Sequence, residues 1–232
     1  MTHDDHDHDH DHDHDHDHHH GGDGHTHPPQ RDHDAGPMSA YEVLEETIRS
    51  LLIDKGVLSA DEIAAQIDLM DSRTPALGAK VVAKAWSDPA FKAKLMADTR
   101  GALLDMGIDI GTLAEFRTIE NTPDVHNVVV CTLCSCYPKL LLGVPPAWYK
   151  SLAYRSRVVV DPRAVLAEFG VAVPEGVEVR VHDSTADLRY LVLPMRPPGT
   201  EGWSPDKLAS LVTRDAMIGT AIPDPGLRAA AE

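Results

Sequence analysis

The chain has 232 residues, long enough for one or two domains with a packed core, and its 42% hydrophobic and 25% charged residues are close to the globular average. No run approaches the roughly 20 apolar residues of a membrane span, and no cluster of Lys and Arg offers the basic face that nucleic acid requires, so we expect neither a membrane nor a nucleic-acid partner. The formal net charge is −16, of which residues 1–37, with eleven Asp and one Arg, contribute −10.

Residues 1–37 are a low-complexity segment in which His alternates with Asp. Thirteen of the fifteen His lie here, with almost no apolar side chains, so we expect a disordered arm that cannot offset the entropy of ordering. Neutral imidazoles beside carboxylates are good ligands for divalent metals, which favours a metal-binding arm. Two other interpretations stay open: a solubilising tail whose metal affinity is incidental, and an engineered purification tag.

Residues 38–107 are predicted to be helical. Two S-x-x-E capping boxes, each ahead of apolar residues at helical spacing, predict helices over 39–55 and 59–71. A third helix is expected over 76–86 and a fourth over 88–107. The amphipathic segments give few signs of an independent compact core.

Residues 108–232 are predicted to mix strands and helices. The β-branched and apolar runs predict strands around 128–130, 157–160, 178–181 and 190–193. Short helices are expected after Pro145–Pro146 and after the Asp161 cap, with a last helix over 204–219. Because the regular strand and helix alternation of a doubly wound sheet is missing, the fold class is α+β.

All three cysteines lie in the six residues Cys131-Thr132-Leu133-Cys134-Ser135-Cys136. This spacing excludes a distributed disulfide framework and indicates the reducing cytoplasm, with cysteines kept for chemistry. A structural zinc site would lack a second cysteine pair, although His126 could be a fourth ligand. An iron–sulfur cluster would lack a fourth cysteine, and a cysteine nucleophile has no need of three crowded thiols. A vicinal disulfide switch and a metal held by the three sulfurs stay open.

The motif and its flanks resemble a known family. VVVCTLCSCYP, preceded by ENTPDVHN and followed by LGVPPAWYK, is similar to the metal site of the α subunit of nitrile hydratase and of the related subunit of thiocyanate hydrolase, over roughly residues 40–220. The resemblance implies a helical N-terminal arm over 38–107 that packs on a partner subunit, with a small helical bundle on this chain's own core as the alternative. It also implies a layered α-β-β-α catalytic domain over 108–232. It implies a hydro-lyase that converts small nitriles to amides; a thiocyanate hydrolase subunit and a non-catalytic metal carrier are the alternatives.

The same resemblance implies a set of site residues. The sulfurs of Cys131, Cys134 and Cys136 and the amide nitrogens of Ser135 and Cys136 would bind one trivalent metal. Cys134 would be a sulfinic acid, Cys136 a sulfenic acid and Cys131 a thiolate. Thr132, where the iron type has Ser, indicates non-corrin Co(III) rather than Fe(III).

Cys136 and Ser135 are the candidate catalytic residues under this resemblance. Cys136 would act through its sulfenate oxygen, as nucleophile or base. Ser135 would act through its hydroxyl, or would serve only as a small residue that lets the loop fold tightly. Five ligand atoms from one loop leave one octahedral position open, which is typical of a catalytic metal.

The resemblance also implies partners. No arginine pair lies beside the motif to hold oxidised sulfurs, and family members receive theirs from a β subunit, so we expect an α2β2 heterotetramer and a cobalt-inserting activator protein. Two residues depart from the family pattern. Lys139 replaces the Trp of Y-P-W-P, and either points to solvent beside a wider pocket or favours an anionic substrate such as thiocyanate. Thr112 stands near the place where many members carry Gln.

Overall fold

The computed structural model describes residues 39–226, so the His/Asp-rich arm over 1–37 and residues 227–232 lie outside the described part of the chain. The elements in chain order are α1 (Ala40–Asp54), α2 (Ala60–Asp71), α3 (Pro75–Ser87), α4 (Pro89–Ala97), α5 (Thr99–Asp105), β1 (Glu115–Glu120), β2 (Val125–Val130), α6 (Lys139–Leu142), α7 (Ala147–Lys150), α8 (Leu152–Arg157), α9 (Pro162–Glu168), β3 (Glu178–Asp183), β4 (Leu188–Leu193), α10 (Pro205–Ala209) and a 3-10 helix (Ala216–Ile218). The chain mixes helices and strands, as its pattern predicts. Within 39–226 no helix is both long and apolar enough to cross a membrane.

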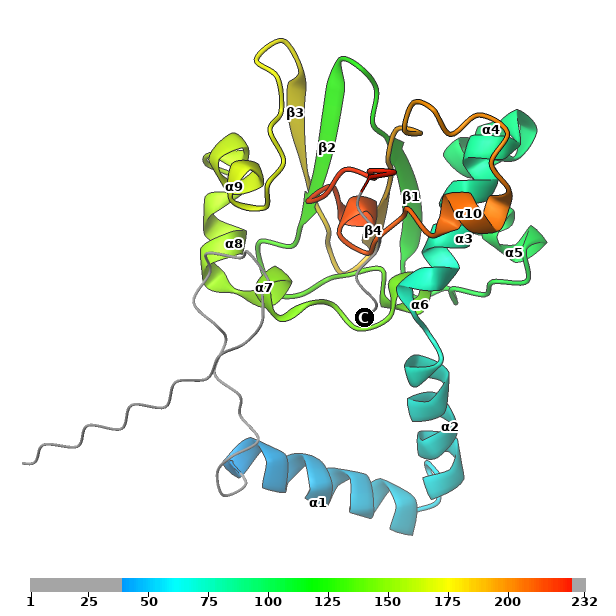
Figure 1. Cartoon of the computed structure of the whole chain (residues 1–232). Coiled ribbons are helices and arrows are strands. Elements are labelled where there is room, and N and C mark those ends of the chain that lie inside the picture. Colours follow the sequence, from blue (N-terminus) through cyan, green and yellow to red (C-terminus); the bar gives the residue numbers. More distant parts are fainter. Residues whose placement is uncertain (1–38, 227–232) are drawn as a thin grey trace, which may run out of the picture.

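Helices α1 and α2 form through local signals. Ser39 and Ser59 are their N-caps, and each closes the expected capping box with the glutamate three residues later. Neither helix contains a buried residue, and large apolar side chains such as Leu44 stay about half exposed, at 52%. Figure 1 shows both helices projecting from the rest of the molecule. Region 38–107 is therefore not uniform, because only α3 to α5 contribute buried side chains.

The four strands form two parallel pairs. β1 pairs with β4, with Glu115 opposite Leu188, and β2 pairs with β3, with Val125 opposite Glu178. The chain reverses direction between β1 and β2, at an antiparallel bridge from Thr122 to Val125. Figure 1 shows the strands side by side in the order β3, β2, β4, β1. The ends of β2 and β3 therefore lie at the same edge as the beginnings of β1 and β4.

One hydrophobic core joins the strands to the helices. Val82, Leu95 and Leu103 from α3, α4 and α5 are fully buried in the same cluster as Val129 of β2 and Leu191 of β4. Figure 1 shows α3, α4, α5 and α10 beside β1, and α8 and α9 on the other side, beside β3. Helices thus lie on both sides of the strands.

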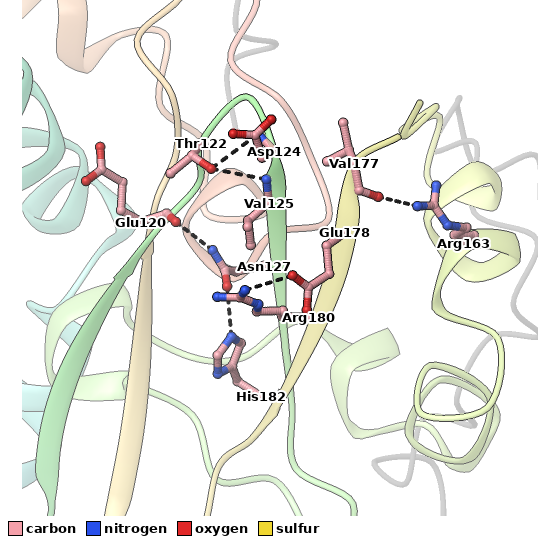
Figure 2. Close-up of polar contacts among 10 residues, drawn as sticks. All are labelled: Glu120, Thr122, Asp124, Val125, Asn127, Arg163, Val177, Glu178, Arg180 and His182. Carbon is pink, nitrogen blue, oxygen red and sulfur yellow. Dashed lines mark hydrogen bonds and ion pairs between the residues drawn. The ribbon is translucent and has the colours of Figure 1, made fainter. Parts of the chain in front are cut away.

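A buried polar network joins the two strand pairs (Figure 2). In the middle of β2, the side-chain amide of Asn127 donates to the carbonyl oxygen of Glu120 at 2.8 Å and to Oδ1 of Asn121 at 3.0 Å. Its own Oδ1 lies 2.8 Å from Nε2 of His182 on β3. Burial lowers the pKa of His182, which keeps the ring neutral and makes this Nε2–H a donor. The network fixes β3 just before Asp183, a residue that reaches the candidate site.

Two predicted helices differ from the structure. The fourth predicted helix is split into α4 and α5 because Asp98 caps the second of them, its side chain accepting a backbone N–H of the next turn. The helix predicted over 204–219 ends at Ala209, and the 3-10 helix ends at Gly219 with φ of +88°. A Cβ at Gly219 would meet the carbonyl oxygen of Asn127 at 2.0 Å, so only glycine allows this close approach to β2.

The prediction of a strand near 157–160 is wrong. Val158 is the C-cap of α8, and of this apolar run it alone is buried, while the next two valines lie exposed in the turn before α9. The pattern also missed β1. Only Phe116 and Thr118 of that strand are buried, between exposed Glu115 and Arg117, so its apolar signal is weak.

Candidate metal centre

Residues 131–136, which we call the cysteine claw, follow directly from the end of β2. Cys131 is buried, Cys136 half-buried and Cys134 exposed. The Sγ atoms of Cys131 and Cys134 are 3.5 Å apart, those of Cys134 and Cys136 are 3.4 Å apart, and all three lie within 4.8 Å of one another. In the described part of the chain, no other three His, Cys, Asp or Glu residues bring ligand atoms this close. The claw is therefore the candidate metal centre.

The backbone of the claw turns its N–H groups toward the sulfurs. The N–H of Cys134 donates to Sγ of Cys131 at 3.2 Å. Hydrogen bonds from the Cys136 and Cys131 thiols, and then from the backbone N–H groups of Ser135 and Cys136, lower the pKa of the Cys134 thiol. Nitrogen and sulfur atoms thus face one point, and thiolate-rich donor sets suit transition metals. The residues present fit a metal ion held by the claw.

The thiols of Cys134 and Cys136 respond differently to the fold. Burial, followed by the hydrogen bond to Cys134, raises the pKa of Cys136 to about 12, against the positive charge of Arg189. Cys134 therefore loses its proton first and Cys136 retains it. If both thiols held a metal cation, this difference would disappear, because a coordinating thiol is deprotonated outright.

Asp183 at the end of β3 anchors the first turn of the claw. Its Oδ1 accepts the backbone N–H of Thr132 at 2.9 Å, and its Oδ2 accepts the Thr132 hydroxyl at 2.6 Å. The register of β3 against β2 places Asp183 opposite Val130, so parallel pairing delivers the carboxylate to the claw. Thr132 thus has a structural role in this chain whatever it indicates about the metal.

Two arginines distant in sequence reach the claw. Nη1 of Arg155, on α8, donates to the carbonyl oxygen of Thr132 at 3.2 Å, and Arg189, on β4, is close enough to Cys136 to oppose the rise of its pKa. Neither arginine could be assigned to the site from the sequence, because each is brought there by strand or helix packing. The chain therefore supplies positive charge at the claw, where the motif alone suggested none.

His126 does not belong to the claw. It is buried near the start of β2, and its Nε2 lies 2.7 Å from the carbonyl oxygen of Gly219. Burial lowers its pKa, so the ring is neutral and donates to that carbonyl. At about 3.3 Å per strand residue it is roughly 16 Å along β2 from Cys131. A zinc site built from the three cysteines and His126 is therefore excluded.

The claw opens outward among exposed side chains. Ser135 and Lys139 are exposed, and so are the large apolar residues Leu133 at 85% and Val144 at 63%. Thr112, also exposed, lines a separate surface cavity of about 410 Å³ together with residues of α4, α5 and β1, and no residue of the claw lines it. Leu133 is therefore the large apolar side chain that the claw itself exposes.

Comparison with known proteins agrees with the resemblance of the motif. The family model described as "Nitrile hydratase, alpha chain" matches residues 39–221. The low-molecular weight cobalt-containing nitrile hydratase subunit alpha of Rhodococcus rhodochrous is 50% identical over 190 residues, covering 81% of this chain and 92% of that protein.

Thiocyanate hydrolase is also similar. Its subunit gamma from Thiobacillus thioparus is 43% identical over 201 residues, covering 82% of this chain and 83% of that protein. Among solved structures, a recombinant thiocyanate hydrolase described as comprising partially modified cobalt centres superimposes with a TM-score of 0.78 at 42% identity, covering 84% of this chain and 95% of that one. Both groups of relatives therefore share the fold with this chain.

Proposed function

The chain belongs to the nitrile hydratase α-chain family, and on this premise we propose that it is the metal-bearing α subunit of a nitrile hydratase, hydrating nitriles to amides at a non-corrin Co(III) centre. The observation that carries the proposal is the cysteine claw, with three Sγ atoms within 4.8 Å of one another. The 50% identity to a relative named as cobalt-containing supports the choice of metal.

In this proposal the claw supplies every protein ligand. Cys131, Cys134 and Cys136 hold the metal through sulfur, and Ser135 and Cys136 hold it also through their amide nitrogens. Cys134 carries a sulfinic acid and Cys136 a sulfenic acid, while Cys131 stays a thiolate. The exposure of Cys134 supports its oxidation, and the burial of Cys131 supports its survival as a thiolate.

The remaining tasks are divided between residues of the claw and two residues that hold it in place. A bound trivalent cobalt ion supplies the Lewis acidity that hydration of a nitrile requires. Asp183 and Arg155 hold the backbone of Thr132, so the sulfurs keep their positions during turnover. The hydroxyl of Ser135, exposed beside Cys134, donates to a polar atom of the substrate, and Cys136 acts as nucleophile or base through its sulfenate oxygen.

The assembly in this proposal is an α2β2 heterotetramer, with an activator protein that inserts the cobalt. Helices α1 and α2 support a β partner because they bury nothing on this chain, and Tyr41, Leu44, Ile48 and Ile63 line an open apolar cavity of about 530 Å³ between them. Residues 38–107 would pack on the β subunit through these two helices. Residues 108–232 would form the catalytic domain, layered as α-β-β-α.

Replacing Cys136 tests the catalytic centre. Cys136→Ser, produced with the β subunit and cobalt, should abolish nitrile hydration because it removes a ligand and the oxidised sulfur together. Ser210→Ala, which removes an exposed hydroxyl at the C-cap of α10, should retain turnover. Unchanged hydration by Cys136→Ser would contradict the proposal.

The oxidation states are tested by the mass of the tryptic peptide over 118–139 from active, cobalt-loaded protein. Two added oxygens on Cys134 are expected, with a third on Cys136 in gently handled samples. Three unmodified thiols in active protein would contradict the oxidised ligands.

A thiocyanate hydrolase subunit is the second candidate, and Lys139 favours it. The side chain is exposed, three residues beyond Cys136 at the start of α6, where an ammonium group would attract an anion. If thiocyanate is the substrate, Lys139→Gln should raise the KM for thiocyanate several-fold at low salt, whereas Lys150→Gln, an exposed lysine at the end of α7, should not. Equal KM values in both variants would remove the support that Lys139 gives to this candidate, and an absence of thiocyanate turnover by the parent would contradict it.

Residues 1–37, outside the described residues, are proposed as a metal-binding arm that helps load the claw. Thirteen His among 37 residues support this role. Deleting the arm should leave activity intact with plentiful cobalt and raise the cobalt concentration needed during expression. No difference at limiting cobalt would contradict the loading role. Loss of most bound metal in excess cobalt would instead identify a non-catalytic metal carrier.

A further inference from the structure

Side chains of the helix pair α7–α8 form hydrogen bonds with the backbone of the cysteine claw and of the end of β2, which precedes it. Three side chains within seven residues of this pair each donate a hydrogen bond to a carbonyl oxygen: Tyr154 to Val129 at 2.7 Å, Arg155 to Thr132 at 3.2 Å and Tyr149 to Cys136 at 2.9 Å. The accepting carbonyls lie before the claw, within it and at its last cysteine. One short segment therefore fixes both ends of the claw.

Tyr149 is itself held firmly. Its side chain is fully buried, and its ring packs edge to face against Tyr137, the residue after Cys136, with 5.1 Å between centroids. Tyr154, also fully buried, lies 5.8 Å from the Tyr149 ring on the other side. Because rotation of a packed ring would displace its neighbours, the Tyr149 hydroxyl points in one direction.

We propose that Tyr149 is a positioning residue of the metal centre, fixing the Cys136 peptide and so the direction in which Cys136 presents its sulfur. The carbonyl carbon, the amide nitrogen and the Cβ of Cys136 are bonded to one Cα, so anchoring the carbonyl limits the rotation of the whole residue. Residues that orient metal ligands in this way typically change metal affinity by 10- to 100-fold when removed. The inference rests on the proposed metal centre and does not depend on the substrate.

Tyr154 offers a matched control. It is the same residue type in the same helix pair, equally buried, and its hydroxyl also donates to a main-chain carbonyl. That carbonyl belongs to Val129, inside β2 and two residues before the claw begins, where ladder hydrogen bonds also hold the strand. Removing the Tyr154 hydroxyl thus costs a buried hydrogen bond without freeing a cysteine.

The experiment compares Tyr149→Phe and Tyr154→Phe in the full-length chain, produced with the β subunit and loaded with cobalt. Absorption from sulfur-to-cobalt charge transfer reports the claw alone, because imidazole ligands in residues 1–37 give no such band. The cobalt concentration during production that gives half of the maximal band should rise roughly 10- to 100-fold in Tyr149→Phe, and the position of the band should be shifted. Tyr154→Phe should keep the band and the half-maximal cobalt concentration of the parent while its Tm falls at least as far.

Two results would overturn the inference. A half-maximal cobalt concentration equal to that of the parent in Tyr149→Phe would do so, and so would an equal rise in both variants, because an equal rise indicates general loosening of the fold. If Tyr149→Phe gives little protein, the band per folded chain is measured on its purified folded fraction, with the same criteria. A parent without the band would contradict the proposed cobalt centre itself, so the two failures are distinguishable.

Discussion

Helices α1 and α2 and the body that begins at α3 are built on different principles. The first two helices carry complete capping boxes but bury no residue. In the body, α4 to α10 include several helices of only four to seven residues, such as α6 and α8, yet each contributes a fully buried side chain. Isolated helices that short are unstable in water, so packing holds them. Local signals thus specify α1 and α2, whereas tertiary contacts specify the body and its claw.

The largest expected effect comes from the core of the body. Leu191 of β4 is fully buried, so Leu191→Ala should lower the free energy of unfolding by about 2–5 kcal/mol. Leu113→Ala, at a side chain that is 92% exposed, is the control and should stay within about 0.5 kcal/mol. Urea unfolding of both variants measures the difference, and similar losses would contradict a core centred on the strands.

Acid should weaken the body through His126. Burial keeps the folded pKa of His126 below its ordinary value of about 6.5, so below that pH the unfolded chain binds a proton that the folded chain does not. Stability from this group is therefore lost as pH falls below about 6.5, by at most about 1.4 kcal/mol per pH unit. His126→Gln should reduce the difference in unfolding free energy between pH 7.5 and pH 5.5; an unchanged difference would exclude this origin.

The capping box of α2 should matter only locally. Ser59→Ala removes the acceptor for the N–H of Glu62 and should destabilise α2 by about 1 kcal/mol. Because α2 has no buried residue, its amides should exchange about fivefold faster while global unfolding is unchanged. Ser204→Ala removes the N-cap of α10, a helix that contains the buried residue Leu208, and should instead lower global stability. A global effect of Ser59→Ala would contradict the separation of the two regions.

The smallest expected effect on the chain alone comes from α1. Ile48 is 48% exposed, so Ile48→Ala should change the unfolding free energy of the chain without its partner by less than about 0.5 kcal/mol. The same change should weaken binding to the β subunit, measured by titration of one subunit with the other. Affinity equal to that of the parent would remove α1 from the proposed interface.

The predictions from sequence succeeded where a signal is local and failed where packing decides. The N-caps at Ser39, Ser59 and Asp161 were all visible in the sequence, because a cap needs only residues within one turn. The prediction of a strand over 157–160 was wrong because a β-branched run forms a strand only if a neighbouring strand pairs with it. Here Val158 is the C-cap of a helix instead.

The sequence by itself determined the N-caps of α1, α2 and α9, the mixture of helices and strands, and the six residues that bring three cysteines together, since all of these depend on neighbours in the chain. Only the tertiary structure decided what surrounds the claw. The pairing of β3 with β2 brings Asp183 to the claw, and β4 carries Arg189. The docking of α7 and α8 brings Tyr149 and Arg155. These residues lie 13 to 53 residues beyond the claw, so no pattern in the sequence links them to it. A hydrogen bond between distant residues depends on how whole elements pack.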